Sequence, residues 1–187
     1  MRDKDIRPVL SAHLKGCHRD EPETVLRDEL GICAGTARVD LAVINGELSG
    51  YEIKSDQDSL TRLPRQVEAY SRVLDRATLV ATERHLERAR EMIPEWWGMI
   101  LVTTSSTELQ AVRDAELNPS VDAFSIAQLL WREEALHELR MRGVAQGLSG
   151  SARHYVWLAL IAAVDIDELR AIARRQLRGR EPWPDVP

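Results

Sequence analysis

The 187-residue chain contains little phenylalanine, cysteine or lysine, and it has no long hydrophobic run. Its two cysteines, Cys17 and Cys33, form no C-x-x-C pair, so we expect free thiols in a reducing cytoplasm. A zinc site made from these cysteines and His18 would lack a fourth ligand at a suitable spacing. The longest apolar run, residues 156–164, is too short to cross a bilayer, and residues 1–8 are charged and lack the apolar stretch of a signal peptide. The sequence therefore predicts a cytoplasmic protein with no membrane partner.

Two further absences exclude classes of catalytic and binding site. None of the five histidines has a partner at the spacing of a catalytic triad or a metal site, and the chain has no glycine-rich phosphate loop. The net charge of −5 opposes a general nucleic-acid coat protein. Residues 61–90 nevertheless hold seven arginines against four acidic residues. Because local charge matters more than the total, a nuclease is not excluded.

Hydrophobic residues make up 44% of the chain, which supports one domain or a core with a small appendage. Apolar spacing predicts helices at residues 5–14, 58–74, 83–92, 125–141, 151–164 and 166–178. It predicts strands at residues 39–44, 48–54, 77–81, 97–104 and 109–116, while residues 23–32 fit either a helix or an edge strand. We therefore expect an α/β (α+β) fold, with a small mixed β-sheet flanked by helices in residues 1–118 and a helical C-terminal subdomain in residues 119–187.

The most informative stretch is a predicted β-hairpin at residues 38–54, which turns at Asn45-Gly46. A two-residue turn would pair Ile44 with Glu47. A three-residue loop would instead pair Val43 with Glu47 and place the glycine in the left-handed conformation of a bulge. The two turns differ by one residue in register, which moves every side chain of a strand to the other face. The turn therefore decides which side chains meet.

We predict the three-residue loop because it separates ionic from apolar side chains. It places Asp40 opposite Gly50, with Glu52 on the diagonal. One face then carries Asp40, Ala42, Gly50, Glu52 and Lys54, and the other carries Val39, Leu41, Val43, Tyr51 and Ile53. The small residues Ala42 and Gly50 would leave room for an ion and a phosphate.

Asp40, Glu52 and Lys54 would form a compact ionic site. Diagonal neighbours on adjacent strands lie about 7 Å apart, near enough for two carboxylates to reach one cation. Hard carboxylate oxygens suit Mg²⁺ or Mn²⁺. Only three of the 25 basic residues are lysines, so a lysine set in a strand indicates a role that arginine performs badly. The alternative is that these three side chains form surface ion pairs on an exposed sheet face.

The hairpin resembles the signature of the PD-(D/E)xK nuclease superfamily, which has the restriction-endonuclease-like fold. Asp40 matches the family's first acid and Glu52-Ile53-Lys54 matches its (D/E)-x-K, while Val39 replaces the family's proline. The patterns R-V-D-x-A-V-x-N-G, G-Y-E-I-K-S-D and R-L-P-x-Q…Y are similar to those of a group of small bacterial proteins, over residues 23–105. The resemblance is specific for the fold and much less specific for the substrate.

The resemblance implies a nuclease that depends on Mg²⁺ or Mn²⁺. By carry-over, Asp40, Glu52 and the main-chain carbonyl of Ile53 would bind the metal. Lys54 would orient or help deprotonate the attacking water and stabilise the charge on the phosphorane. The family often adds an upstream glutamate from its first core helix, and Glu29 is the best positional match for that ligand.

The helix after the hairpin carries a polar stripe, because Arg62, Gln66 and Tyr70 recur at i, i+4 and i+8. The Gln-x-x-x-Tyr pair resembles the exonuclease branch linked to recombination helicases, where it lines the active site. The resemblance implies that Gln66 supports catalysis near Lys54, and that Arg62, Gln66 and Tyr70 contact the substrate, with Arg62 on a backbone phosphate. The alternative is a solvated helix face that ends in an ordinary half-buried tyrosine.

Other conspicuous residues are expected to have structural roles. We interpret Asp56 and Asp58 as turn and cap residues rather than metal ligands. Trp96-Trp97 and Trp131 are expected to pack in the core rather than to stack on bases. The arginines between residues 170 and 180 are interspersed with acids, so we expect a solvated helix face there.

The leading hypothesis is a Mg²⁺-dependent nuclease that hydrolyses phosphodiester bonds of DNA by in-line attack of a metal-activated water. The second hypothesis is a catalytically silent module of the nuclease fold, which binds DNA or a protein partner through residues 119–187. A weaker third hypothesis is an interaction protein of the toxin or immunity type. Cutting both strands with one such site would favour a homodimer.

Overall fold

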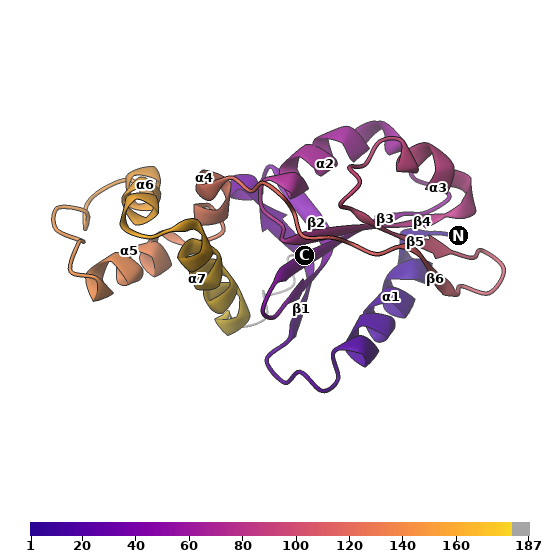
Figure 1. Ribbon diagram of the computed structural model, residues 1–187, viewed down its shortest axis with the longest axis horizontal. Helices are drawn as coiled ribbons and strands as arrows, with labels where there is room; N and C mark the ends of the chain where they lie inside the picture. The colour runs from indigo at the N-terminus through magenta and orange to yellow at the C-terminus, as the bar shows by residue number, and fades with distance from the viewer. Residues whose placement is uncertain (181–187) are drawn as a thin grey trace.

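The structure is a computed structural model that describes residues 1–180 (Figure 1). Within that range it contains six strands and seven α-helices, with two short 3₁₀ turns. The strands are β1 (Val25–Ile32), β2 (Ala37–Ile44), β3 (Leu48–Lys54), β4 (Arg76–Thr82), β5 (Gly98–Val102) and β6 (Leu109–Arg113). The helices are α1 (Asp3–Cys17), α2 (Leu63–Ser71), α3 (Glu83–Arg90), α4 (Ala123–Ala127), α5 (Arg132–Met141), α6 (Arg153–Ala163) and α7 (Ile166–Gly179), and the 3₁₀ turns are η1 (Cys33–Gly35) and η2 (Leu60–Arg62).

The six strands form one mixed sheet in the order β1-β2-β3-β4-β5-β6. β1, β2 and β3 are antiparallel neighbours, β3, β4 and β5 are parallel, and β6 returns antiparallel to β5. Parallel neighbours need crossover connections, which contain α2 between β3 and β4 and α3 between β4 and β5. The expected α+β fold with a mixed sheet flanked by helices is confirmed. Within residues 23–32, which fitted either a helix or an edge strand, residues 25–32 form the edge strand β1.

Helices cover both faces of the sheet, with α1 on one face and α2 and α3 on the other (Figure 1). The apolar residues Ile6, Leu10 and Leu14 recur at helical spacing on α1 and are buried with Leu41 and Ile53 of the sheet. A larger cluster fills the α2 and α3 side. Among the helices of residues 1–180, none has the length and apolar character needed to span a membrane.

The aromatic pair Trp96-Trp97 belongs to the larger cluster. Trp97 is fully buried and stacks on Tyr70 of α2 with ring centroids 5.6 Å apart. Trp96 is partly buried and packs edge-on against Trp97. The expectation that this pair packs in the core is therefore confirmed.

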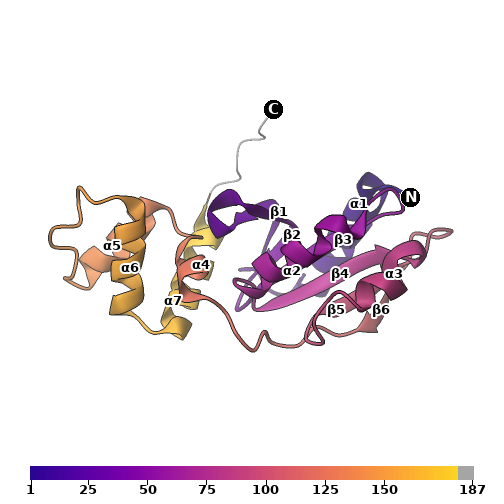
Figure 2. The ribbon, with the colours of Figure 1, turned by 90° about the horizontal axis from the view of Figure 1, so that it is seen from above.

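Helices α4 to α7 lie beside the β1–β2 edge of the sheet (Figures 1 and 2). The expected single helix at residues 125–141 is two helices, α4 and α5. A new helix begins at α5, where the Glu134 carboxylate accepts a 2.7 Å hydrogen bond from the Trp131 N–H. Apolar side chains of α4 to α7 belong to the same cluster as the sheet. The division into two domains at residue 118 stays a prediction, and residues 181–187 lie outside the described part of the chain.

Arginines of the last helix stabilise its packing on the rest of the protein. Arg170 and Arg174 pair with Asp75 at 2.8 and 3.0 Å, and the Asp75 side chain is only 5% exposed. Arg180 lies over the ring of Trp131, 4.4 Å from the ring centroid. The expected solvated face is thus wrong for these arginines. The core position expected for Trp131 is also wrong, because this side chain is 52% exposed.

The hairpin between β2 and β3 turns through a three-residue loop, but one residue later than expected. Ile44 pairs with Leu48, which leaves residues 45–47 in the loop. The Asn45 side chain accepts a 2.9 Å hydrogen bond from the Glu47 N–H, and the Glu47 carbonyl accepts one of 3.0 Å from the Asn45 N–H. The predicted pairing of Glu47 within the ladder is wrong, because these bonds place it in the loop.

Two glycines of the hairpin also differ from expectation. Gly46 is not among the residues with positive φ within residues 1–180, so the expected left-handed bulge does not form. At Gly50, an added Cβ would lie 2.4 Å from Leu74 Cδ1 and 3.0 Å from Val39 Cγ1. Apolar side chains fill the space beside Gly50, and the expectation that it accommodates an ion and a phosphate is wrong.

Candidate active site

Strands β2 and β3 separate partway along their length and form a fork. Their ladder ends at Leu41 and Tyr51. Beyond this point β3 continues to pair with β4 as far as Lys54, and the first part of β2 pairs with β1. The Asp40 Oδ2 atom accepts a 2.7 Å hydrogen bond from the Ile53 N–H at the opening of the fork. The Asp40 side chain therefore replaces a main-chain hydrogen-bond partner of β3. This replacement occurs where the predicted metal ligands lie.

The alternation of faces along β2 breaks at Asp40. Leu41 is buried in the cluster under α1, whereas Val39 is buried in the cluster under α2. Side chains two residues apart on a regular strand point to the same face, so the strand rotates between these two residues. The predicted common face for Val39 and Leu41 is wrong. The Asp40 carboxylate is directed toward the Ile53 N–H of β3.

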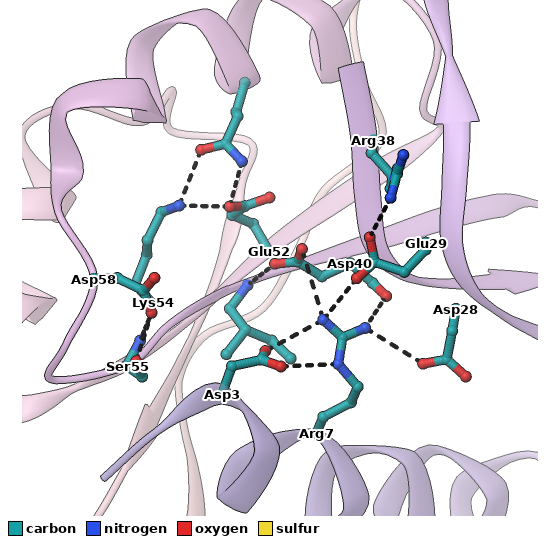
Figure 3. A network of polar contacts seen from close by, with 12 residues as sticks. Asp3, Arg7, Asp28, Glu29, Arg38, Asp40, Glu52, Lys54, Ser55 and Asp58 are labelled. Carbon is teal, nitrogen blue, oxygen red and sulfur yellow. Dashed lines mark hydrogen bonds and ion pairs between the residues drawn. The ribbon is translucent and has the colours of Figure 1, made fainter. Parts of the chain in front are cut away.

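Glu52 and Lys54 lie in a buried hydrogen-bond network (Figure 3). Glu52 is 1% exposed and Lys54 is 2% exposed. Lys54 Nζ donates to Glu52 Oε1 at 2.6 Å and to Gln66 Oε1 at 3.0 Å. Gln66 Nε2 in turn donates to Glu52 Oε1 at 2.5 Å. The acid, the lysine and the glutamine singled out in the sequence therefore form a closed triangle of hydrogen bonds.

Tyr70 completes this network from α2. Its hydroxyl is hydrogen-bonded to Glu52 Oε2 and lies 2.8 Å from the carbonyl oxygen of Arg38. Burial, and then the charge of Glu52, raises the pKa of Tyr70, so the hydroxyl keeps its proton and acts as a donor. Because Gln66 contacts Glu52 and Tyr70 is fully buried, the alternative of a solvated helix face with a half-buried tyrosine is wrong for these two residues.

An arginine that the sequence did not single out lies among the acidic residues of the site. The Arg7 guanidinium of α1 forms ion pairs with Glu29 at 2.9 Å, Asp3 at 3.1 Å, Asp28 at 3.4 Å and Asp40 at 3.8 Å (Figure 3). It also donates to the main-chain carbonyl of Asp40 at 2.5 Å. Helix α1 therefore supplies a positive charge beside the fork.

Glu29 lies on strand β1 rather than on a helix, in contrast to the upstream glutamate of the resembled family. Its φ of 54° is in the left-handed region. The carboxylate contacts Arg7 at 2.9 Å and Arg38 at 3.4 Å. Glu29 shares a cavity with Asp40, but its role as a metal ligand stays a prediction because two guanidinium groups occupy its oxygens.

The fork opens into a cavity of about 790 Å³ with two kinds of wall. Elements α1, β1 and β2 contribute the acidic side chains Asp3, Glu29 and Asp40. Elements η2 and α2 contribute Arg62 and Arg65, which are exposed and form no ion pair within residues 1–180. One wall of the cavity is therefore rich in carboxylates, and the other carries guanidinium groups without ion-pair partners in the described chain.

The charges in this cavity are not fully balanced. Burial, and then the nearby charge of Glu52, raises the pKa of Asp40 to about 7. The Ile53 N–H and the charge of Arg7 act in the opposite direction but do not cancel these effects. A cation placed between the two carboxylates would offset the repulsion that Glu52 exerts on an ionised Asp40.

The donor set fits Mg²⁺ better than a metal that needs many protein ligands. No group of three or more His, Cys, Asp or Glu side chains in the described chain is arranged to hold a metal ion. Mg²⁺ keeps several waters and binds through one or two carboxylates, the role that the sequence predicts for Asp40 and Glu52. The N–H and C=O of a strand residue point toward the same neighbouring strand, so the Ile53 carbonyl also faces the fork. These groups would suffice for a partly hydrated ion.

Asp56 and Asp58 follow β3 and have structural roles, as expected. Asp58 accepts hydrogen bonds from the Ser55 N–H at 2.8 Å and from the Ser55 hydroxyl at 2.5 Å, which closes the turn after the strand. Asp56 accepts a 2.7 Å hydrogen bond from the N-terminal amine.

The structure thus brings Asp40, Glu52, Lys54, Gln66 and Tyr70 together at the fork and places Arg62 on the cavity wall. Sequence reasoning missed two arginines that line the same cavity. Arg65 belongs to the arginine-rich stretch 61–90, and its spacing of three residues from Arg62 is the signal that could have found it. Arg7 contacts a residue 33 positions away, and no local pattern marks that contact.

Comparison with known proteins assigns the chain to a family. The match to the family described as Bacteriophage P4 protein cII covers residues 2–182, so the chain belongs to that family. The chain is similar to Protein cII of Enterobacteria phage P4, with 24% identity over 148 residues that cover 77% of this chain and 55% of that protein. The chain therefore spans about half the length of this curated relative.

A solved structure of a protein of unknown function from Silicibacter pomeroyi is also similar. The likeness covers 74% of this chain and 92% of that chain, with 20% identity and a TM-score of 0.42.

Proposed function

We propose that the protein is a Mg²⁺- or Mn²⁺-dependent nuclease that hydrolyses phosphodiester bonds of DNA. The observation that carries this proposal is the meeting of Asp40 and Glu52 at one cavity, with Lys54 hydrogen-bonded to Glu52. Membership of the PD-(D/E)xK superfamily and its fold is part of the same proposal. So are the cytoplasmic location and the homodimer.

The residues divide the chemistry among themselves. A bound Mg²⁺ would lower the pKa of a coordinated water and offset charge on the phosphate oxygens. Asp40, Glu52 and the Ile53 carbonyl would hold the ion. The Lys54 ammonium, fixed 2.6 Å from Glu52, would orient the attacking water and stabilise negative charge on the phosphorane. Gln66 contacts both charged groups and keeps the ammonium in this position.

The cationic wall supports an anionic substrate. Arg62 and Arg65 lack ion-pair partners in the described chain, so their guanidinium groups are available for phosphate oxygens. The acidic wall near Arg7 would repel a phosphate and attract the metal. A strand of nucleic acid would therefore enter along η2 and α2.

Cleavage assays test the proposal. Linear, circular and single-stranded DNA, with RNA of the same sequence, would be incubated with Mg²⁺ or Mn²⁺. The wild-type protein should cut DNA, Lys54→Met should not, and Lys15→Met, which removes an exposed lysine of α1, should cut normally. The absence of cleavage with every substrate and both metals would reject the nuclease.

The second candidate is a silent module that binds DNA or a protein. One observation favours it: each proposed carboxylate ligand already has a cationic neighbour, Lys54 at 2.6 Å from Glu52 and Arg7 at 3.8 Å from Asp40. Titration with Mn²⁺ separates the two candidates. The nuclease requires binding that is lost in Asp40→Ala, whereas binding that survives this change would favour the silent module.

A further inference from the structure

A second cavity, of about 310 Å³, adjoins the active-site cavity. Asp58 lines both cavities, so they are direct neighbours. The lining of the second cavity comes from η2 and α3 and includes Ser59, Thr61, Arg84, His85 and Arg88.

Two guanidinium groups give this cavity a positive charge. Arg84 and Arg88 are exposed and lie four residues apart on α3, so they project from one helix face. Arg84 donates to the carbonyl oxygen of Asp56 at 2.5 Å, and Arg88 forms no ion pair within the described residues. The carboxylate of Asp58 already accepts two hydrogen bonds from Ser55. Two cations against one engaged carboxylate favour an anionic ligand.

Hydrogen-bonding capacity beside the cavity is unused. His85 is only 8% exposed, and its Nε2 atom has no hydrogen-bond partner in the described chain. The His85 ring lines the cavity while protein atoms enclose Nε2 itself, so the ring can report on a ligand that binds there. The hydroxyls of Ser59 and Thr61 lie 2.6 Å apart. One of the two protons serves this contact, and the other is free to donate to a ligand.

From these groups we propose that the second cavity binds a phosphate group of the nucleic-acid strand. This inference rests on the proposed function. Guanidinium forks and hydroxyl donors match the oxygens of a phosphate in charge and geometry. Because η2 separates the two cavities and carries Arg62, the strand crosses η2 with one phosphate at the fork and another at α3. Arg62, Arg84 and Arg88 on this path belong to the arginine-rich stretch 61–90.

Titration with inorganic phosphate, monitored through the NMR signals of the His85 ring, tests the site in the metal-free protein. The ring signals should shift saturably in the wild-type protein. Arg88→Ala should weaken phosphate binding about tenfold, the effect of losing one charge-assisted hydrogen bond. Arg90→Ala removes the same charge from an exposed position of α3 outside the cavity lining and should leave the titration unchanged. Silent His85 signals, or equal behaviour of the two variants, would overturn the site.

Competing oligonucleotides distinguish the two sources of a phosphate. If only a 5′-phosphorylated oligonucleotide displaces inorganic phosphate, the site holds a terminal phosphate. If a 5′-hydroxyl oligonucleotide displaces it equally, the site holds a backbone phosphate. Displacement by neither would overturn the assignment to nucleic acid. A protein that cleaves DNA without any phosphate-dependent shift would refute this site alone, and one that binds phosphate without cleaving DNA would refute the proposed function alone.

Discussion

The Asp40 carboxylate accepts a 2.7 Å hydrogen bond from the main-chain N–H of Ile53. Asp40 lies one residue and Ile53 two residues beyond the last ladder pair of β2 and β3, at the opening of the fork. The other oxygen, Oδ1, lies 3.8 Å from the Arg7 guanidinium. Asp40 thus has a structural contact on one oxygen, in addition to its proposed role as a metal ligand, and substitutions can separate the two roles.

Replacing Asp40 with Asn or with Ala should have the same effect on metal binding and different effects on stability. Neither variant has a carboxylate, so both should lose Mn²⁺ binding in calorimetric titrations. The Asn carbonyl can still accept from the Ile53 N–H, whereas Ala leaves that donor unpaired. Urea unfolding should therefore show Asp40→Ala less stable than Asp40→Asn by about 1–3 kcal/mol. Equal stability of the two variants would contradict the structural contact.

The raised pKa of Asp40 predicts that metal affinity depends on pH. Burial, and then Glu52, raises this pKa to about 7, and the protonated carboxyl is a poor ligand. As the pH falls below about 7, Mn²⁺ affinity should fall by up to about tenfold per pH unit. Calorimetry between about pH 6 and pH 8 measures the slope, and proton release on binding gives an independent check. A flat profile over this range would argue against Asp40 as a ligand.

Stability of the metal-free protein should change with pH in the opposite direction. The folded-state pKa of Asp40 lies above its ordinary value of 3.8, so the folded protein binds this proton more tightly than the unfolded chain does. The resulting stabilisation is fully present at pH values below the ordinary pKa of 3.8 and is lost as the pH rises through about 7. Asp40→Asn stays neutral and should lack this loss. Its Tm relative to wild type should therefore increase from about pH 4 to pH 8, and a constant difference would contradict the raised pKa.

Removing the Arg7 guanidinium should strengthen metal binding. This charge lies 3.8 Å from a proposed ligand oxygen and repels an incoming divalent cation. Arg7→Ala should lower the Kd for Mn²⁺ by about tenfold, corresponding to about 1.4 kcal/mol. Lys4→Ala removes an equal charge from an exposed position of the same helix and serves as the control. Weaker Mn²⁺ binding in Arg7→Ala would instead show that the arginine organises the ligands.

The parts of the site that follow local rules could be predicted from the sequence. The alternation of side chains along β3 places Glu52 and Lys54 on one face, and a helical repeat of four residues places Gln66 and Tyr70 on one stripe. The two patterns meet at Glu52, whose carboxylate accepts hydrogen bonds from Lys54, Gln66 and Tyr70.

Features that depend on contacts between distant segments could not be predicted. The rotation of β2 between Val39 and Leu41 depends on packing against two different helices, and it overrides the alternation that the sequence suggests. Arg7 is an ordinary surface residue by helical spacing until α1 packs beside the fork. Trp131 is exposed and contacts Arg180, which is distant in the sequence, so no local signal marks this arrangement.

Adding a methyl group at Gly50 should destabilise the protein and disturb the fork. The new Cβ would lie 2.4 Å from Leu74 Cδ1 and 3.0 Å from Val39 Cγ1, and both of these side chains are fully buried. Overpacking of this kind costs about 1–3 kcal/mol of unfolding free energy. Gly46→Ala in the hairpin loop is the control, because a Cβ there meets no atom within 4 Å and should change stability by less than about 0.5 kcal/mol. Because Val39 adjoins Asp40, Gly50→Ala should also weaken Mn²⁺ binding, and intact binding in a destabilised variant would show that the apolar packing and the carboxylate position are independent.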